Sequence, residues 1–184
     1  MADLKESPSQ TAGPYVHIGC VPTFAGLEGM FGGQDLGEHM IMGKPEGVRI
    51  SLNLKVIDGA GDPLTDAMIE IWQPGPDGTF GPTNGFSHWG RQPTDSYTGD
   101  AVFETLLPGA ASGQAPHLFV WIAARGINMA LMTRIYFPDH DNAADPVFAL
   151  TGDRAHTLVA TPVDGGFTHV IHLQGDNETV FFDV

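Results

Sequence analysis

Apolar and polar residues alternate along several short stretches of the chain, a pattern typical of β-strands that bury one face. In the clearest stretch, residues 48–57, every second residue from Val48 to Val56 is aliphatic and the residues between them are polar. We expect this stretch to be a half-buried antiparallel strand, ended by the turn residues at 58–63. Further strands are predicted at 67–73, 101–106, 118–124, 129–137, 157–161, 167–173 and 179–183.

Three segments show neither the strand period nor the helix period. Residues 7–19 and the glycine-rich residues 24–43 precede the first strand, and residues 79–97 interrupt the strands with a long loop rich in aromatic residues, glycine and proline. A helical turn is predicted only at 141–145. The sequence therefore predicts an all-β, single-domain antiparallel β-sandwich with long loops over residues 47–184, preceded by an N-terminal arm and loop over residues 1–46.

Composition supports this fold and excludes several functions. Glycine and proline account for 24 and 14 of the 184 residues, about a fifth, whereas about 12% is average, and so many turn-forming residues disfavour a helical bundle. The formal net charge of −14 repels nucleic acid and anionic lipid, so neither is an expected partner. A single cysteine, a polar N-terminus and the lack of a long apolar run predict a cytoplasmic protein.

Eight histidines raise the question of a metal site. His169 and His172 are three residues apart in a predicted strand, so their side chains leave opposite faces and cannot chelate one ion without a bulge. His117 begins a strand, but Phe119 occupies the position that would complete a His-x-His pair. His117 is therefore expected to be a hydrogen-bonded residue at a strand end. No motif for nucleophilic catalysis or phosphate binding is present.

Arg134 lies inside the strand predicted at 129–137. Alternation puts it on one face with Met132 and Tyr136. An arginine beside a tyrosine hydroxyl could bind a carboxylate with two parallel hydrogen bonds. An exposed strand face, or a structural ion pair with one of the 22 acidic residues, would explain the same pattern.

Five motifs in one order give the chain a resemblance to a known family. They are Ser9-Gln-Thr-Ala-Gly-Pro-Tyr15, Met68-Ile-Glu-Ile-Trp-Gln73, Ala124-Arg-Gly-Ile127, Thr133-Arg-Ile-Tyr-Phe137 and Gly175-Asp-Asn-Glu-Thr-Val-Phe-Phe-Asp183. Each motif is weak alone, but together they resemble the intradiol ring-cleaving dioxygenases over nearly the whole chain, from Ser7 to Val184. Within that family, the chain is most similar to the alpha chains of members built from alpha and beta chains.

The resemblance implies a β-sandwich that works with non-haem Fe(III) held by a partner beta chain through two tyrosines and two histidines. This chain departs from that ligand set. The first ligand tyrosine would fall at Phe80, the loop at 107–114 has no tyrosine, and of the histidine pair only His117 remains, because the other position is Phe119. The arginine that precedes this pair in iron-binding chains is Gln114 here. We therefore expect no iron in this chain.

The resemblance also implies which residues of this chain face the partner's substrate pocket. They are Thr11, Gly13, Pro14 and Tyr15 of the arm, together with Arg134. Tyr15 and Arg134 would bind the substrate carboxylate, Gly13 and Pro14 would let the backbone approach the ring, and Thr11 would hydrogen-bond nearby. This implication favours the carboxylate-binding interpretation of Arg134.

The function implied is oxygen-dependent cleavage of protocatechuate to 3-carboxy-cis,cis-muconate, in aromatic catabolism, by a higher hetero-oligomer of alpha–beta pairs. No residue of this chain is expected to break a bond. Two alternatives remain open. One is a metal-free β-sandwich binding or scaffold module, and the other is a self-sufficient metalloenzyme with ligands drawn from His39, His88, His117 and His140.

Overall fold

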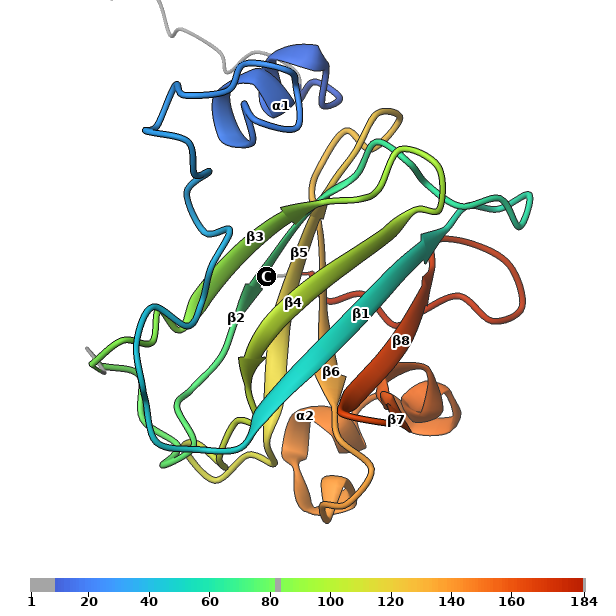
Figure 1. Cartoon of the computed structure of the whole chain (residues 1–184). Coiled ribbons are helices and arrows are strands. Elements are labelled where there is room, and N and C mark those ends of the chain that lie inside the picture. Colours follow the sequence, from blue (N-terminus) through green and yellow to red (C-terminus); the bar gives the residue numbers. More distant parts are fainter. Residues whose placement is uncertain (1–8, 82–83, 184) are drawn as a thin grey trace, which may run out of the picture.

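The computed structural model describes residues 9–81 and 84–183, and these form a sandwich of two four-stranded sheets (Figure 1). The first sheet has the order β4-β1-β8-β7 and the second has the order β3-β2-β5-β6. The predicted β-sandwich is therefore confirmed. The strands are β1 (Arg49–Ile57), β2 (Met68–Trp72), β3 (Trp89–Pro93), β4 (Asp100–Leu106), β5 (His117–Ala123), β6 (Leu131–Tyr136), β7 (Thr161–Val163) and β8 (Gly166–His172).

The core lies between the two sheets and is built from the inward-facing residues of each strand. On β1 the alternating aliphatic residues, including Leu52 and Leu54, are fully buried, and Ile71 and Ile122 of the second sheet belong to the same cluster. Gln73 is the buried polar residue that links the sheets. Its Nε2 donates to the Leu106 carbonyl at 2.7 Å, and its Oε1 accepts the Thr105 hydroxyl at 2.6 Å.

One strand pairing differs from the purely antiparallel sandwich that we predicted. β1 is antiparallel to β4 but parallel to β8, so the first sheet is mixed. Alternation along a strand shows which face is buried and carries no information on the direction of its neighbours.

Several elements differ from the sequence-based prediction. β3 lies inside the segment predicted to be a loop, and residues 179–183 form no strand. The strand predicted at 157–161 begins inside the 3₁₀ helix η2 (Gly152–Leu158), and its last residue is the first of β7. The helical turn predicted at 141–145 is present as the 3₁₀ helix η1 (Asn142–Ala144). The short helix α2 (Pro146–Ala149) follows it, and the Asp145 carboxylate caps α2 by accepting from two of its backbone N–H groups.

The N-terminal arm, described from residue 9 onward, contains the helix α1 (Pro14–Cys20), which was not predicted. α1 begins with proline and buries none of its residues, so it lacks the apolar period by which a helix is recognised. Residues 1–8 of the predicted arm and residue 184 of the predicted sandwich lie outside the described residues. In Figure 1, α1 lies at one end of the sandwich and α2 at the other. Among the described residues, no helix is long and apolar enough to cross a membrane.

Candidate functional site

The arm is attached to the sandwich through Thr11. The Thr11 Oγ1 accepts the backbone N–H of Gly126 at 2.7 Å and donates to the carbonyl of Ala124 at 3.4 Å. Both residues directly follow β5. Two hydrogen bonds of one hydroxyl therefore fix the arm just beyond the end of β5, an inner strand of the second sheet.

A shallow pocket of about 160 Å³ lies beside this attachment point. Its lining includes Gly13, Pro14, Asp66 and Arg125. Arg125 is 81% exposed along its side chain and its Nε lies 3.0 Å from Asp66 Oδ2, while Tyr15 is 85% exposed. This end of the molecule therefore presents a guanidinium and a phenol to the surroundings, next to a glycine–proline step.

Arg125 is the residue of this surface that the sequence analysis missed. It lies in the motif 124–127, whose presence supported the resemblance, but no role was assigned to it. Its position beside the arm depends on the contact between Thr11 and Gly126, which are 115 residues apart in sequence. No local pattern reveals such a contact.

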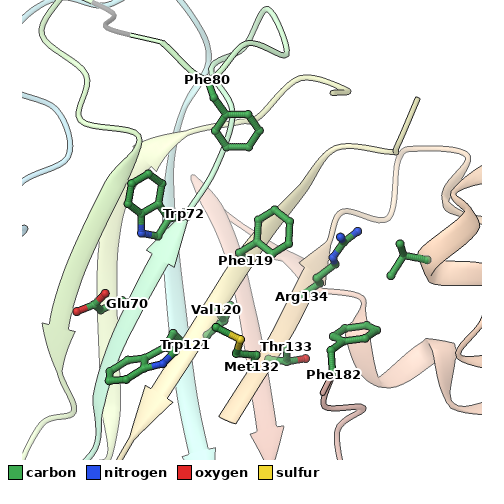
Figure 2. A pocket seen from close by; sticks show the side chains of 11 residues that line it. Glu70, Trp72, Phe80, Phe119, Val120, Trp121, Met132, Thr133, Arg134 and Phe182 are labelled. Carbon is green, nitrogen blue, oxygen red and sulfur yellow. The ribbon is translucent and has the colours of Figure 1, made fainter. Parts of the chain in front are cut away.

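A larger cavity of about 710 Å³ lies on the outer face of the second sheet, over the middle of β5 (Figure 2). It is bounded by β2, β5 and β6, by the loop carrying Phe80, by α2 and by the C-terminal segment. The lining is mostly apolar, with five aromatic side chains and a single arginine. The residues used below are Trp72, Phe80, Phe119, Trp121, Arg134 and Phe182.

Arg134 occupies the wall of this larger cavity and is only 9% exposed. Its Nη1 donates to the Gln114 Oε1 and to the Tyr136 hydroxyl, both at 3.1 Å, and its Cζ lies 4.5 Å from the centre of the Phe119 ring. The predicted shared face of Arg134 and Tyr136 is thus confirmed. In Figure 2 the guanidinium lies beside the Phe119 ring.

Behind Arg134 lies a buried layer of His117, Tyr136 and Asp145. Burial lowers the pKa of His117, and the charge of Arg134 lowers it further, although the bond to the Ala115 carbonyl opposes both effects. The Nδ1 of His117 lies 2.7 Å from that carbonyl oxygen, as expected for a hydrogen-bonded strand end. Burial also raises the pKa of Tyr136, so its phenol stays neutral at physiological pH.

The cavity residues do not fit a ferric iron. At the positions that the resemblance matches to iron ligands, Phe80 and Phe119 have no ligand atom, and His117 alone supplies an imidazole. Gln114, at the position of the family's arginine, is hydrogen-bonded to Arg134. A search of the described residues finds no group of three or more His, Cys, Asp or Glu side chains able to hold a metal. An adjacent guanidinium also disfavours a bound cation.

The structure brings the predicted arm residues together but places Arg134 elsewhere. Thr11, Gly13, Pro14 and Tyr15 lie in one segment that contacts the chain just after β5, next to Arg125. Arg134 pairs across the strands with Phe119, five residues before Ala124, which is about 17 Å along a strand. Arg125 and Arg134 therefore lie at different surfaces of the same chain.

Comparison with known proteins identifies the family. No family model matches the chain. Two protocatechuate 3,4-dioxygenase alpha chains are each 37% identical to it, one from Pseudomonas putida over 98% of this chain and 97% of that one, and one from Burkholderia cepacia over 100% of both. The Burkholderia cepacia beta chain is 30% identical over 68% of this chain and 64% of its own length.

Solved structures support the same fold. An intradiol ring-cleavage dioxygenase from Tetranychus urticae superposes with a TM-score of 0.59 at 18% identity, covering 92% of this chain and 93% of that one. Catechol 1,2-dioxygenase from Pseudomonas arvilla C-1 superposes with a TM-score of 0.55 at 21% identity, covering 76% and 56%. With 37% identity over nearly the full length of two alpha chains and this shared fold, the chain belongs to the family of protocatechuate 3,4-dioxygenase alpha chains, within the intradiol dioxygenases.

Proposed function

We propose that this chain is the iron-free subunit of a protocatechuate 3,4-dioxygenase and forms one wall of an active site whose iron is held by a beta chain. Intradiol dioxygenases are non-haem iron enzymes. In this proposal the complex opens the protocatechuate ring with O₂ to give 3-carboxy-cis,cis-muconate, and no residue of this chain breaks a bond. The 37% identity to two alpha chains supports the assignment.

The poor fit of this chain's own residues to iron supports placing the metal on the partner. The positions that match iron ligands hold Phe80, His117 and Phe119, and the guanidinium of Arg134 lies among them. A single imidazole beside a buried cation cannot replace a set of four ligands. The alignment with a beta chain supports a partner of related sequence.

The observation that carries the proposal is the surface made by the arm and Arg125. Tyr15 is a large side chain that finds almost no burial within the chain. Gly13 has an ordinary negative φ of −124°, and an added Cβ would meet no atom of the described chain within 4 Å. No contact within residues 9–81 and 84–183 explains why these residues are an exposed phenol and a glycine, whereas contact with a substrate and a second chain would use both.

The physical roles follow from the side chains. The Tyr15 hydroxyl can donate to the substrate carboxylate, and Gly13 with Pro14 leaves room for the aromatic ring. Thr11 holds the segment in place through its two hydrogen bonds. The exposed ion pair of Arg125 with Asp66 contributes no more than about 1 kcal/mol, so a substrate carboxylate can replace Asp66 as the partner of the guanidinium.

The predicted carboxylate-binding role of Arg134 remains a proposal, but its position assigns it to a different cavity. We expect Arg125 to supply the positive charge beside the arm, since it shares a pocket lining with Gly13 and Pro14. The alpha–beta pairs are proposed to assemble into a higher hetero-oligomer in the cytoplasm, with residues 1–46 contributing to the pocket and the subunit interface and residues 47–184 forming the sandwich.

The test is steady-state kinetics of the chain co-expressed with its beta chain. Tyr15→Phe and Arg125→Gln should each raise KM for protocatechuate about tenfold while changing kcat much less, because they remove binding to the carboxylate and not the chemistry. With 4-methylcatechol, which lacks the carboxylate, the same variants should differ little from wild type. The matched control is Arg154→Gln, another surface arginine in an ion pair, with Glu178 at 3.3 Å.

Unchanged kinetics for both variants in an intact complex would contradict the proposed wall. The chain would then act as a scaffold for the beta chain, and iron found in the purified chain alone would contradict the iron-free assignment.

A further inference from the structure

The larger cavity contains a buried cation with no counter-charge among the described residues. Arg134 is 9% exposed, and none of the ion pairs of the described chain includes it. Its two hydrogen bonds go to neutral acceptors, Gln114 and Tyr136, although a guanidinium carries five N–H donors. A buried charge without a partner is costly, so this position favours a bound anion.

No nearby carboxylate of the described residues forms an ion pair with Arg134. The Asp145 carboxylate accepts backbone N–H groups from Ala115, Val147 and Phe148 and is hydrogen-bonded to the Tyr136 side chain, so it reaches Arg134 only through that hydroxyl. Glu70, which lines the far part of the cavity, lies 2.7 Å from Arg91. Neither carboxylate neutralises Arg134 at ion-pair distance.

The volume and lining of the cavity indicate what group carries the negative charge of the ligand. Its volume of about 710 Å³ falls in the range of about 300–1,000 Å³ that is usual for small-molecule sites. The rings of Phe119 and Phe182 lie with their centres 4.5 and 5.9 Å from the guanidinium carbon of Arg134, and Trp72 and Phe80 line the cavity farther from it (Figure 2). Such a lining favours a flat aromatic group and offers little to a phosphate or a sugar.

From this geometry we infer that the cavity is a second, iron-free binding site for a single-ring aromatic carboxylate. The carboxylate lies against the Arg134 guanidinium, which can bind it with two parallel hydrogen bonds, and the ring lies against Phe119 and Phe80. No ring cleavage takes place here.

This inference does not rest on the proposed function, because every residue that it uses belongs to this chain and lies away from the arm. The two can fail separately. Loss of the arm's role leaves the cavity unchanged, and an empty cavity leaves the wall of the partner's active site unchanged.

The experiment titrates the full-length chain with 4-fluorobenzoate, followed by ¹⁹F NMR, with 4-fluorobenzamide as the uncharged analogue. We expect the acid to bind at least tenfold more tightly than the amide. Arg134→Gln should weaken acid binding at least tenfold, Arg134→Lys should weaken it less, and the control Arg154→Gln should leave it unchanged. Equal binding of acid and amide to wild type would overturn the inference.

A second variant tests the same site independently, in case the Arg134 substitutions impair folding. Phe119→Leu keeps the charge of Arg134 and removes a ring face, so it should weaken binding of 4-fluorobenzoate several-fold. Binding of formate, a carboxylate without a ring, should stay the same. If Arg134→Gln melts like wild type and binds equally well, the inference is wrong. It is also wrong if binding is lost with Arg125→Gln and kept with Arg134→Gln, since the ligand then binds at the arm.

The same titration of the iron-loaded complex shows whether the cavity stays accessible. We expect one binding event per alpha chain that leaves the visible absorption of the iron unchanged and is weakened by Arg134→Gln. Absence of this event would mean that the partner covers the cavity, and the inference would be overturned.

Discussion

Acidification is expected to destabilise the sandwich through one buried histidine, His169 on β8. It is 5% exposed, pairs with Leu54 of β1, and its Nε2 has no hydrogen-bond partner among the described residues. Burial lowers the pKa of His169 to about 4, with a smaller contribution from the charge of His172, although the backbone of Val159 opposes the shift. Between this pKa and the higher pKa of the unfolded chain, His169 therefore stays neutral in the folded chain and binds a proton in the unfolded chain.

The size and sign of the effect follow from the two pKa values. In the unfolded chain a histidine has a pKa of about 6.5, so between about pH 6.5 and pH 4 the unfolded state binds more protons. His169 therefore leaves stability intact above about pH 6.5 and lowers it as the pH falls towards 4. The linkage relation gives a loss of about 2–3 kcal/mol in the free energy of unfolding at pH 4.5.

The assay is urea unfolding at pH 7.0 and at pH 4.5, for wild type and for His169→Gln, with exposed His156→Gln as the control. Other groups also titrate in this range, so the informative quantity is the difference between the variants. The loss of stability on acidification should be about 2–3 kcal/mol smaller in His169→Gln than in wild type, and His156→Gln should behave like wild type. Equal losses in all three proteins would refute the assignment of the effect to His169.

Three further predictions concern the arm, a tight loop and the polar link between the sheets. Thr11→Val should remove the hydrogen bond to Gly126, at a cost of about 1 kcal/mol to arm docking, and should speed proteolysis of the arm several-fold, whereas Thr11→Ser should not. Gly78 has a φ of +78°, and an added Cβ would collide with the Ala110 carbonyl oxygen, so Gly78→Ala should cost about 2 kcal/mol or more in a thermal melt. Gln73→Leu should cost about 2–3 kcal/mol in urea unfolding because its two partners on β4 are left buried without a bond.

Strands with one buried face could be predicted from the sequence, and those without one could not. β1 shows strict alternation of buried and less buried residues, and its prediction was correct within one residue. β3 has a single buried residue, Gly90, and its Arg91 is bound to Glu70 of β2, so its pairing depends on a neighbour and not on its own pattern. β7 has no buried residue and is three residues long.

Site residues whose position follows from a local pattern could likewise be predicted, and those whose position depends on a tertiary contact could not. The shared face of Arg134 and Tyr136 follows from the strand period, which is a local property of the sequence. The position of Phe119 under the guanidinium requires the register between β5 and β6, and the position of Arg125 beside the arm requires the Thr11 contact. Both positions depend on tertiary contacts. The sequence analysis therefore points to Arg134 for the positive charge beside the arm, whereas our proposal gives that role to Arg125.

Loss of the iron ligands changes the sign of the ion that this cavity favours. Where the family resemblance places ligand side chains, Phe80 and Phe119 remove the donor atoms that would hold a cation, and their rings line the cavity instead. The Arg134 guanidinium, hydrogen-bonded to Gln114, then faces this space without an ion-pair partner in the described part of the chain. We infer that such a cavity favours an aromatic anion over a ferric ion, and under the proposed function the same substitutions leave the iron chemistry to the partner chain.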